Sequence, residues 1–98
     1  MNRFVYKLIP PRPTFAQDMT PEERAVMTEH VTYWLSLLEQ GRVVVFGPVQ
    51  EPDRTWGLGV FEAEDLDDAQ AVVDGDPAIS TGTATMELSP MVAAHTRG

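Results

Sequence analysis

A single stretch of this chain has the apolar spacing of a long amphipathic helix. Apolar residues recur at positions 26, 27, 31, 34, 37 and 38, which places them on one side of a helix. Just before this stretch, Thr20 and Glu23 have the spacing of a capping box, and Pro21 suits the first helical position. Gly41 suits the left-handed residue that closes a helix. The sequence therefore predicts a long helix that begins after Thr20 and ends at Gln40–Gly41.

Four other segments have the patterns of β-strands. Residues 4–9 and 82–89 alternate between two faces, and residues 55–63 follow a turn at 51–54. Residues 43–46 form a continuous β-branched and aromatic run, which is typical of a strand buried on both faces. This strand is expected to stop at Gly47–Pro48 and to form a hairpin with residues 55–63.

A second helix and a loop complete the pattern. Asp65 is placed to cap a shorter helix that Gly75 closes, with Leu66, Ala69 and Val73 expected to face inward. Three prolines between positions 10 and 13 predict an extended loop, because proline lacks the N–H group that regular pairing needs. The chain is expected to stay irregular through position 18.

The order of these elements is βαββαβ. This order predicts an α+β, ferredoxin-like fold, in which a four-stranded antiparallel sheet carries two helices on one face. The opposite sheet face also has apolar residues, since Phe61 points opposite to Trp56, Leu58 and Val60. Such a face must be buried somewhere. We therefore expect a homodimer that forms through the open sheet face.

Composition and charge narrow the classes of partner. The length of 98 residues suits one domain, which is expected to span residues 1–98. The formal net charge of −8 disfavours binding to nucleic acid or to an anionic membrane surface. The apolar residues near the start are too few for a signal peptide or a membrane span. The acidic residues between positions 62 and 76 form either a solvated helix face or a partner-binding surface.

Cysteine and histidine usage limits the chemistry further. The chain has no cysteine, which excludes disulfides and thiolate metal sites and favours a cytoplasmic location. Its two histidines are not spaced with carboxylates as metal ligands are, so that no metal site is expected.

His30 is the leading candidate for chemistry. It lies in the predicted long helix, on the face that carries Trp34 and Leu37. Imidazole changes charge closest to neutral pH, and a half-buried histidine can therefore carry protons. A buried histidine can equally be a core residue that its hydrogen bonds satisfy. The residues alone leave both interpretations open.

Other residues are candidates for the walls of a substrate site. Arg12 lies between prolines, where its guanidinium either clamps a carboxylate or phenolate or is an exposed loop cation. The pair Gly47 and Pro48 either brings the backbone close to a ligand or simply ends a strand. Three aromatic residues line a cavity or belong to the core: Phe15, Trp34 and Trp56. Two glycines on one strand face leave room for a ligand or a partner side chain: Gly57 and Gly59.

Six motifs occur in a fixed order along most of the chain. They are Pro10-Pro11-Arg12-Pro13-x-Phe15, Met27-x-x-His30-x-x-Tyr33-Trp34, Gly41-x-Val43-x-x-Phe46-Gly47-Pro48-Val49, Trp56-Gly57-Leu58, Asp76-Pro77-Ala78 and Pro90-Met91. In this combination the chain resembles the YciI-like (YCII-related) family. The resemblance covers the sequence from Phe4 to Met91.

This resemblance implies a fold and a catalytic pair. The implied fold is a dimeric α+β barrel of ferredoxin-like subunits. The implied catalytic pair is a histidine on the first helix and an aspartate in the Asp-Pro turn after the second helix, which are His30 and Asp76 in this sequence. Asp76 also has a structural interpretation, because aspartate before proline readily caps a helical turn. One branch of the family is linked to dehydrochlorination.

Three functions compete on this basis. The leading hypothesis is a cofactor-independent lyase or isomerase, in which Asp76 orients His30 as a general acid–base on a small, anionic, cyclic or aromatic molecule. The alternative is a non-catalytic dimeric module that binds a small molecule or a protein. The third is a cofactor-free monooxygenase, which the His–Asp pair disfavours.

Overall fold

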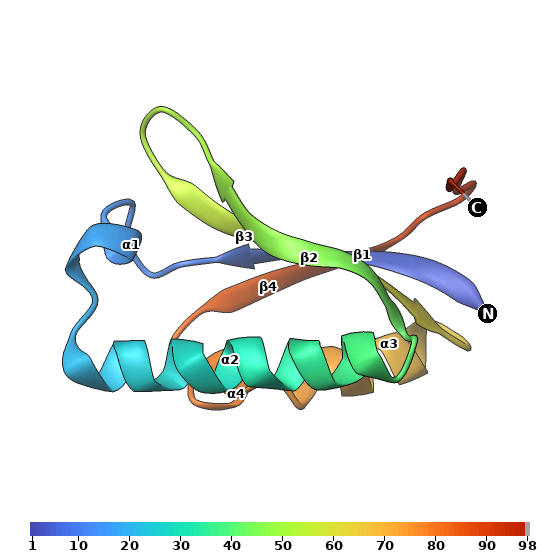
Figure 1. The fold of residues 1–98 in the computed structure, drawn as a ribbon, viewed down its shortest axis with the longest axis horizontal. Coiled ribbons are helices and arrows are strands. Elements are labelled where there is room, and N and C mark those ends of the chain that lie inside the picture. Colours follow the sequence, from blue (N-terminus) through green and yellow to red (C-terminus); the bar gives the residue numbers. More distant parts are fainter. Residues whose placement is uncertain (98) are drawn as a thin grey trace.

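The computed structural model describes residues 1–97, which form a sheet layer and a helix layer (Figure 1). The sheet has four antiparallel strands in the order β2-β3-β1-β4. The strands are β1 (Asn2–Ile9), β2 (Val43–Gln50), β3 (Thr55–Ala63) and β4 (Thr85–Pro90), and the helices are α1 (Phe15–Asp18), α2 (Pro21–Glu39), α3 (Leu66–Asp74) and α4 (Pro77–Ser80). The predicted α+β, ferredoxin-like class is confirmed.

The long helix α2 begins and ends where the sequence predicts. The hydroxyl of Thr20 accepts the backbone N–H of Glu23 over 3.1 Å, and the Glu23 carboxylate accepts the backbone N–H of Thr20 over 2.9 Å. A cap of this kind stabilises a helix by about 1 kcal/mol. Beyond the helix, Gly41 has a φ of +80°, the left-handed conformation that glycine adopts without strain.

The two faces of the sheet differ in burial. Alternate residues of β1, Phe4, Tyr6 and Leu8, point towards the helices and are at most 3% exposed. They pack with Trp34 of α2 and with residues of α3 and α4 in one continuous core. On the opposite face, Val5 and Val60 lie side by side across β1 and β3 and stay half-buried. None of the helices in residues 1–97 has the length and apolar character that crossing a bilayer requires.

Strand β2 departs from its prediction in two ways. It continues through Gly47 and Pro48 to Gln50, because β2 is an edge strand and a proline there leaves no neighbour without a hydrogen bond. It is also not buried on both faces within this chain, since Val44 is 44% exposed and Val45 is 54% exposed. An irregularity in the pairing with β3 between Val43 and Val45 turns Val44 out to the edge.

Smaller differences concern the helices and the last strand. The segment expected to be irregular through position 18 contains the short helix α1, and a second short helix, α4, follows Asp76. Strand β4 begins at Thr85 rather than at position 82. Leu66 does not face inward: it is 54% exposed in the first turn of α3, and the buried face of this short helix is Ala69, Val72 and Val73.

Candidate functional site

His30 and Asp76 lie beside each other in the folded chain, although 46 positions separate them. His30 comes from the middle of α2 and faces the sheet layer, where it is 7% exposed. Its Nδ1 atom lies 2.7 Å from Oδ2 of Asp76. Burial keeps water away from this contact and strengthens it electrostatically. The fold thus assembles the pair that the family resemblance implied.

Asp76 is fully buried and receives three hydrogen bonds. Its Oδ1 atom accepts the backbone N–H of Ala78 over 2.9 Å, which makes Asp76 the N-cap of α4. Its Oδ2 atom contacts His30 and accepts the indole N–H of Trp34 over 2.8 Å. Capping and pairing use different oxygens of one carboxylate, so the two interpretations of Asp76 are compatible.

The arrangement of donors around Asp76 sets the tautomer of His30. An ionised carboxylate only accepts hydrogen bonds, so the proton of the His30–Asp76 bond sits on Nδ1 of the imidazole. The neutral ring then has its lone pair on Nε2, for which residues 1–97 provide no hydrogen-bond partner. His30 lines a cavity, and Asp76 is not part of its wall.

The cavity has a volume of about 300 Å³ and lies between α2 and the sheet, with α1 at one side. Its wall is almost entirely apolar, and the largest apolar side chains in it are Leu8, Phe15, Met19, Met27 and Phe46. Within residues 1–97, the ionisable side chains of the wall are Tyr6 and His30. A wall of this kind suits a ring-sized molecule, and its low polarity strengthens any charge interaction inside it.

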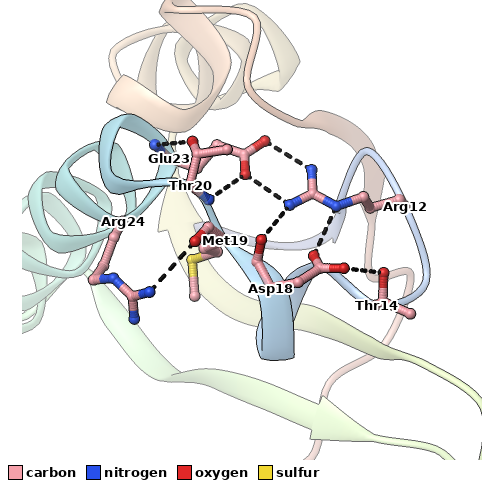
Figure 2. A network of polar contacts seen from close by, with 7 residues as sticks. All are labelled: Arg12, Thr14, Asp18, Met19, Thr20, Glu23 and Arg24. Atoms are coloured by element: carbon pink, nitrogen blue, oxygen red, sulfur yellow. Dashed lines mark hydrogen bonds and ion pairs between the residues drawn. The ribbon is translucent and has the colours of Figure 1, made fainter.

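A polar network holds the segment that closes one side of the cavity (Figure 2). Arg12 donates from Nε to Asp18 over 2.8 Å and from its two terminal nitrogens to the Glu23 carboxylate over 2.8 and 2.9 Å. Glu23 also belongs to the capping box, and the network therefore ties the loop to the start of α2. Hydrogen bonds from Arg12 and then from the Thr20 backbone hold the pKa of Glu23 at about 2. Phe15 of α1 is thereby kept in the cavity wall.

The structure places the residues expected to contact substrate in two groups. Four of them line the cavity: Phe15, Gly47, Pro48 and Trp56. Arg12 lies outside the lining, and its guanidinium is engaged by Asp18 and Glu23. Trp34 lies behind the wall, fully buried, where it supports Asp76 rather than facing the cavity.

Tyr6 is a cavity residue that the sequence did not single out. It is 1% exposed, and its ring lies 4.5 Å from the ring of Trp34, measured between centroids. Burial raises the pKa of the Tyr6 phenol well above its usual value, and the charge of Asp76 raises it further. The phenol therefore remains protonated across the physiological range.

The signal for Tyr6 lies in the glycine opposite it. Tyr6 pairs with Gly59 across β1 and β3, and a Cβ on Gly59 would lie 1.8 Å from the Tyr6 ring. The expectation that Gly59 leaves room for a ligand or a partner is wrong, because the Tyr6 ring fills that space. Gly57 does contribute to the cavity wall, with Leu8 packed against it.

Comparisons with known proteins agree with this fold. A family model, the YCII-related domain, matches residues 4–92. No curated protein matches the chain at a significant level. Among solved structures, the chain is similar to 5-chloro-2-hydroxyhydroquinone dehydrochlorinase (TftG) from Burkholderia phenoliruptrix AC1100, in complex with 2,5-dihydroxybenzoquinone. That match has a TM-score of 0.60 and 17% identity, and it covers 91% of each chain.

Two further solved structures have the same fold. A protein of unknown function from Nitrosomonas europaea, NE2512, matches with a TM-score of 0.51 and 14% identity over 99% of this chain and 95% of that one. SnoaB, a cofactor-independent oxygenase from Streptomyces nogalater, matches with a TM-score of 0.50 and 14% identity over 98% of this chain and 97% of that one. At such identities, the three likenesses show a shared fold.

Proposed function

The chain belongs to the YCII-related domain family, and on this premise we propose that it is a cofactor-independent lyase or isomerase. His30 and Asp76 act as its general acid–base pair. The observation that carries the proposal is the buried 2.7 Å contact between His30 Nδ1 and Asp76 Oδ2 at the edge of an apolar cavity. The other ring nitrogen has no hydrogen-bond partner within residues 1–97, and His30 lines the cavity, so this nitrogen is available for proton transfer to or from a bound molecule.

The proposed chemistry follows from this arrangement. Asp76 keeps the proton on Nδ1, so that Nε2 can take a proton from a C–H or O–H group of the substrate. The imidazolium that forms is balanced by the Asp76 carboxylate. Returning the proton to another atom completes an isomerisation, and loss of a leaving group from the neighbouring carbon completes an elimination. A positioned acid–base group typically contributes a factor of about 10²–10⁴ in rate.

The cavity defines the class of substrate. Its aromatic and aliphatic wall fits a cyclic or aromatic molecule. The similar dehydrochlorinase TftG is itself described with a ring compound, 2,5-dihydroxybenzoquinone. The expectation of an anionic substrate relied on Arg12, which is outside the cavity lining and paired with acidic residues. We therefore propose a substrate that has a ring and an acidic proton, and we do not require that Arg12 binds it.

The experiment that tests this function compares two histidines. Ring ketones, hydroxyquinones and chlorinated hydroquinones are incubated with the protein in D₂O, and proton exchange and elimination are followed by NMR. His30→Gln should lower the rate by about 10²-fold or more while the circular dichroism spectrum stays the same. His95→Gln, in the exposed tail, is the matched control and should keep the full rate.

The alternative function gives a different result. If the wild type binds members of the panel but catalyses neither exchange nor elimination, the chain is a non-catalytic binding module. If His30→Gln unfolds while His95→Gln does not, His30 is a structural core residue.

We also propose that two copies of the chain associate through the open sheet face, in the cytoplasm. Val5, Val45 and Val60 are neighbours across three strands of that face, and Leu58 lies one step further along it. Val45 is 54% exposed in the single chain. A second copy would bury this apolar surface, and the cysteine-free sequence favours the cytoplasmic location.

A further inference from the structure

The hydroxyl of Tyr6 is a second polar group of the cavity, separate from His30. The side chain is almost completely buried and belongs to the cavity wall. Its ring is clamped between Trp34 and the backbone at Gly59, where no Cβ could be accommodated. The hydroxyl makes no hydrogen bond within residues 1–97. The Tyr6 hydroxyl is not among the enclosed, unpaired polar atoms of residues 1–97, so it borders open space, and the open space that Tyr6 lines is the cavity. Polar groups inside native proteins usually have a hydrogen-bond partner, and a ligand in the cavity would supply one to this hydroxyl.

The other tyrosine shows the contrast. Tyr33 is only partly buried, and its hydroxyl donates to the backbone carbonyl of Val72 over 2.6 Å. That bond satisfies Tyr33 within the protein. Tyr6 has no equivalent acceptor in the described part of the chain, and the space next to it is the cavity.

We infer that Tyr6 donates a hydrogen bond to an oxygen atom attached to the ring of the substrate, so that the site takes ring ketones, quinones or phenols rather than hydrocarbons. This inference rests on the proposed function and adds the substrate class and a second residue to it. Tyr6 supplies the only other ionisable side chain in the wall described within residues 1–97, and burial keeps it in the donor form. Tyr6 thus has the role of binding a polar group of the substrate, which the sequence assigned to Arg12.

The inferred role completes a balanced proton transfer. Nε2 of His30 removes a proton from the carbon next to the carbonyl, and the electron pair of that C–H bond moves into a C=C bond as the carbonyl becomes an enolate. The Tyr6 hydroxyl donates to the enolate oxygen, whose charge is larger than that of the carbonyl oxygen. The bond therefore strengthens as the reaction proceeds. The proton then returns from His30, or a leaving group departs from the adjacent carbon.

The test uses 1-indanone, a bicyclic ring ketone, carrying ¹³C at the carbonyl carbon. Infrared difference spectra of the bound ketone report on the carbonyl bond, and NMR in D₂O reports on exchange of the neighbouring protons. In the wild type the bound carbonyl stretch should lie at lower frequency than in Tyr6→Phe, which keeps the ring and removes only the hydroxyl. Tyr6→Phe should also bind the ketone about tenfold more weakly and exchange its protons about 10²-fold more slowly.

The controls separate this role from a structural one. Tyr33→Phe removes the hydroxyl that already has a partner inside the protein, and it should leave the carbonyl frequency unchanged. His30→Gln should keep the low frequency and lose the exchange. If Tyr6→Phe does not fold, wild-type protein labelled with ¹³Cζ-tyrosine is used in its place. The Tyr6 resonance is assigned by comparison with Tyr33→Phe, and its chemical shift should change when the ketone binds.

Each result decides between the two proposals. An identical carbonyl frequency in the wild type and Tyr6→Phe, an unmoved Tyr6 resonance, or no binding of 1-indanone overturns the role of Tyr6. A lowered frequency without any proton exchange supports the role of Tyr6 and overturns the proposed proton transfer by His30. Proton exchange in the wild type without a lowered carbonyl frequency supports the proton transfer by His30 and overturns the role of Tyr6.

Discussion

Trp34 donates its indole N–H to Oδ2 of Asp76 over 2.8 Å, the same oxygen that contacts His30. The indole is fully buried, so it holds the carboxylate in place from the side away from the cavity. The indole nitrogen can only donate, and one carboxylate oxygen can accept from both the indole and the imidazole. This relationship makes Trp34 a positioning residue for the pair rather than a wall of the substrate site.

Asp76→Asn should change both stability and activity. The amide has one accepting oxygen, which the N–H of Ala78 or the N–H of Trp34 can use, but not both. A buried donor left without an acceptor costs about 1–3 kcal/mol, and we expect the free energy of unfolding to fall by about that amount. An amide NH₂ facing Nδ1 also drives the His30 proton to Nε2, which removes the base from the cavity.

Urea unfolding and the exchange assay check this prediction. Asp74→Asn is the matched control, because Asp74 is exposed at the end of α3, and its effect should stay within about 0.5 kcal/mol. Unchanged stability together with full activity in Asp76→Asn would contradict the role assigned to the carboxylate.

Gly59→Ala should be strongly destabilising because of Tyr6. The added Cβ would lie 1.8 Å from the Tyr6 ring, so that the ring or the strand must move. Overpacking of a filled core typically costs about 1–3 kcal/mol. Gly47→Ala, where nothing lies within 4 Å of the new Cβ, is the matched control and should cost much less. Equal unfolding midpoints for the two variants would show that the Tyr6 ring is not where the structure places it.

Arg12→Ala should loosen α1 without unfolding the protein. The variant loses the bonds to Asp18 and Glu23 that tie the loop to α2. Amide hydrogen exchange at residues 14–18 should become faster, and binding of ring ligands weaker, as Phe15 is released from the wall. Arg12→Lys should restore little of the protection, because an ammonium cannot bind a carboxylate in the two-pronged geometry of a guanidinium.

Arg24→Ala is the control for this experiment (Figure 2). Within residues 1–97, the Arg24 side chain makes a single hydrogen bond, 3.3 Å long, to the carbonyl of Met19 in the same network region. Its removal should leave the exchange of residues 14–18 nearly unchanged. Equal acceleration of hydrogen exchange in Arg12→Ala and Arg24→Ala would show that positive charge alone, rather than the Arg12 hydrogen bonds, orders residues 14–18.

Lowering the pH should also loosen residues 14–18. The Arg12 hydrogen bonds hold the pKa of Glu23 at about 2, below the ordinary value of 4.5. Because the pKa of Glu23 is lower in the folded state, the ionised carboxylate stabilises the folded state at pH values above 4.5. This stabilisation is lost as the pH falls from about 4.5 towards 2. Hydrogen exchange at residues 14–18 should therefore accelerate over that range in the wild type. In Arg12→Ala the acceleration should be small, because the stabilising partner is already absent.

Leu58→Glu should break the proposed association of two copies. Leu58 is on the open face of β3, opposite Lys7 of β1, and a carboxylate there would be buried in any sheet-to-sheet contact. Sedimentation should show a dimer for the wild type and a monomer for the variant. Gln70→Glu, exposed on α3, adds the same charge elsewhere and should leave the dimer intact. A wild-type monomer would contradict the proposal directly.

Local signals explain which elements were predictable. The capping box at Thr20 and Glu23, the cap at Asp65 and the left-handed Gly41 act through neighbours in the chain, and each is found where the sequence predicts it. The end of β2 was predicted wrongly at Pro48, because a proline ends a central strand but is tolerated on an edge strand. The position of a strand in its sheet is not a local property.

The roles of Arg12 and Tyr6 were hidden for a related reason. Arg12 was a candidate for substrate binding because a guanidinium between prolines is rigid, yet its partners Asp18 and Glu23 satisfy it first. Tyr6 was not singled out, because an alternating strand does not reveal which face lies over a cavity, and the signal in Gly59 is visible only once the register of β1 and β3 pairs the two residues. Both outcomes depend on which groups the fold brings within hydrogen-bonding distance.

The sequence by itself determined the order of the four strands and the two longer helices, the caps of α2 and α3, and, through its family resemblance, the choice of His30 and Asp76. These features follow from periodicity, from interactions between near neighbours and from ordered motifs. Tertiary structure alone decided that His30, Trp34 and Asp76 share one carboxylate oxygen, that Arg12 is engaged outside the cavity and that Tyr6 faces into it. Burial and hydrogen-bond partners depend on strand register and layer packing, which bring distant residues together and which no local pattern specifies.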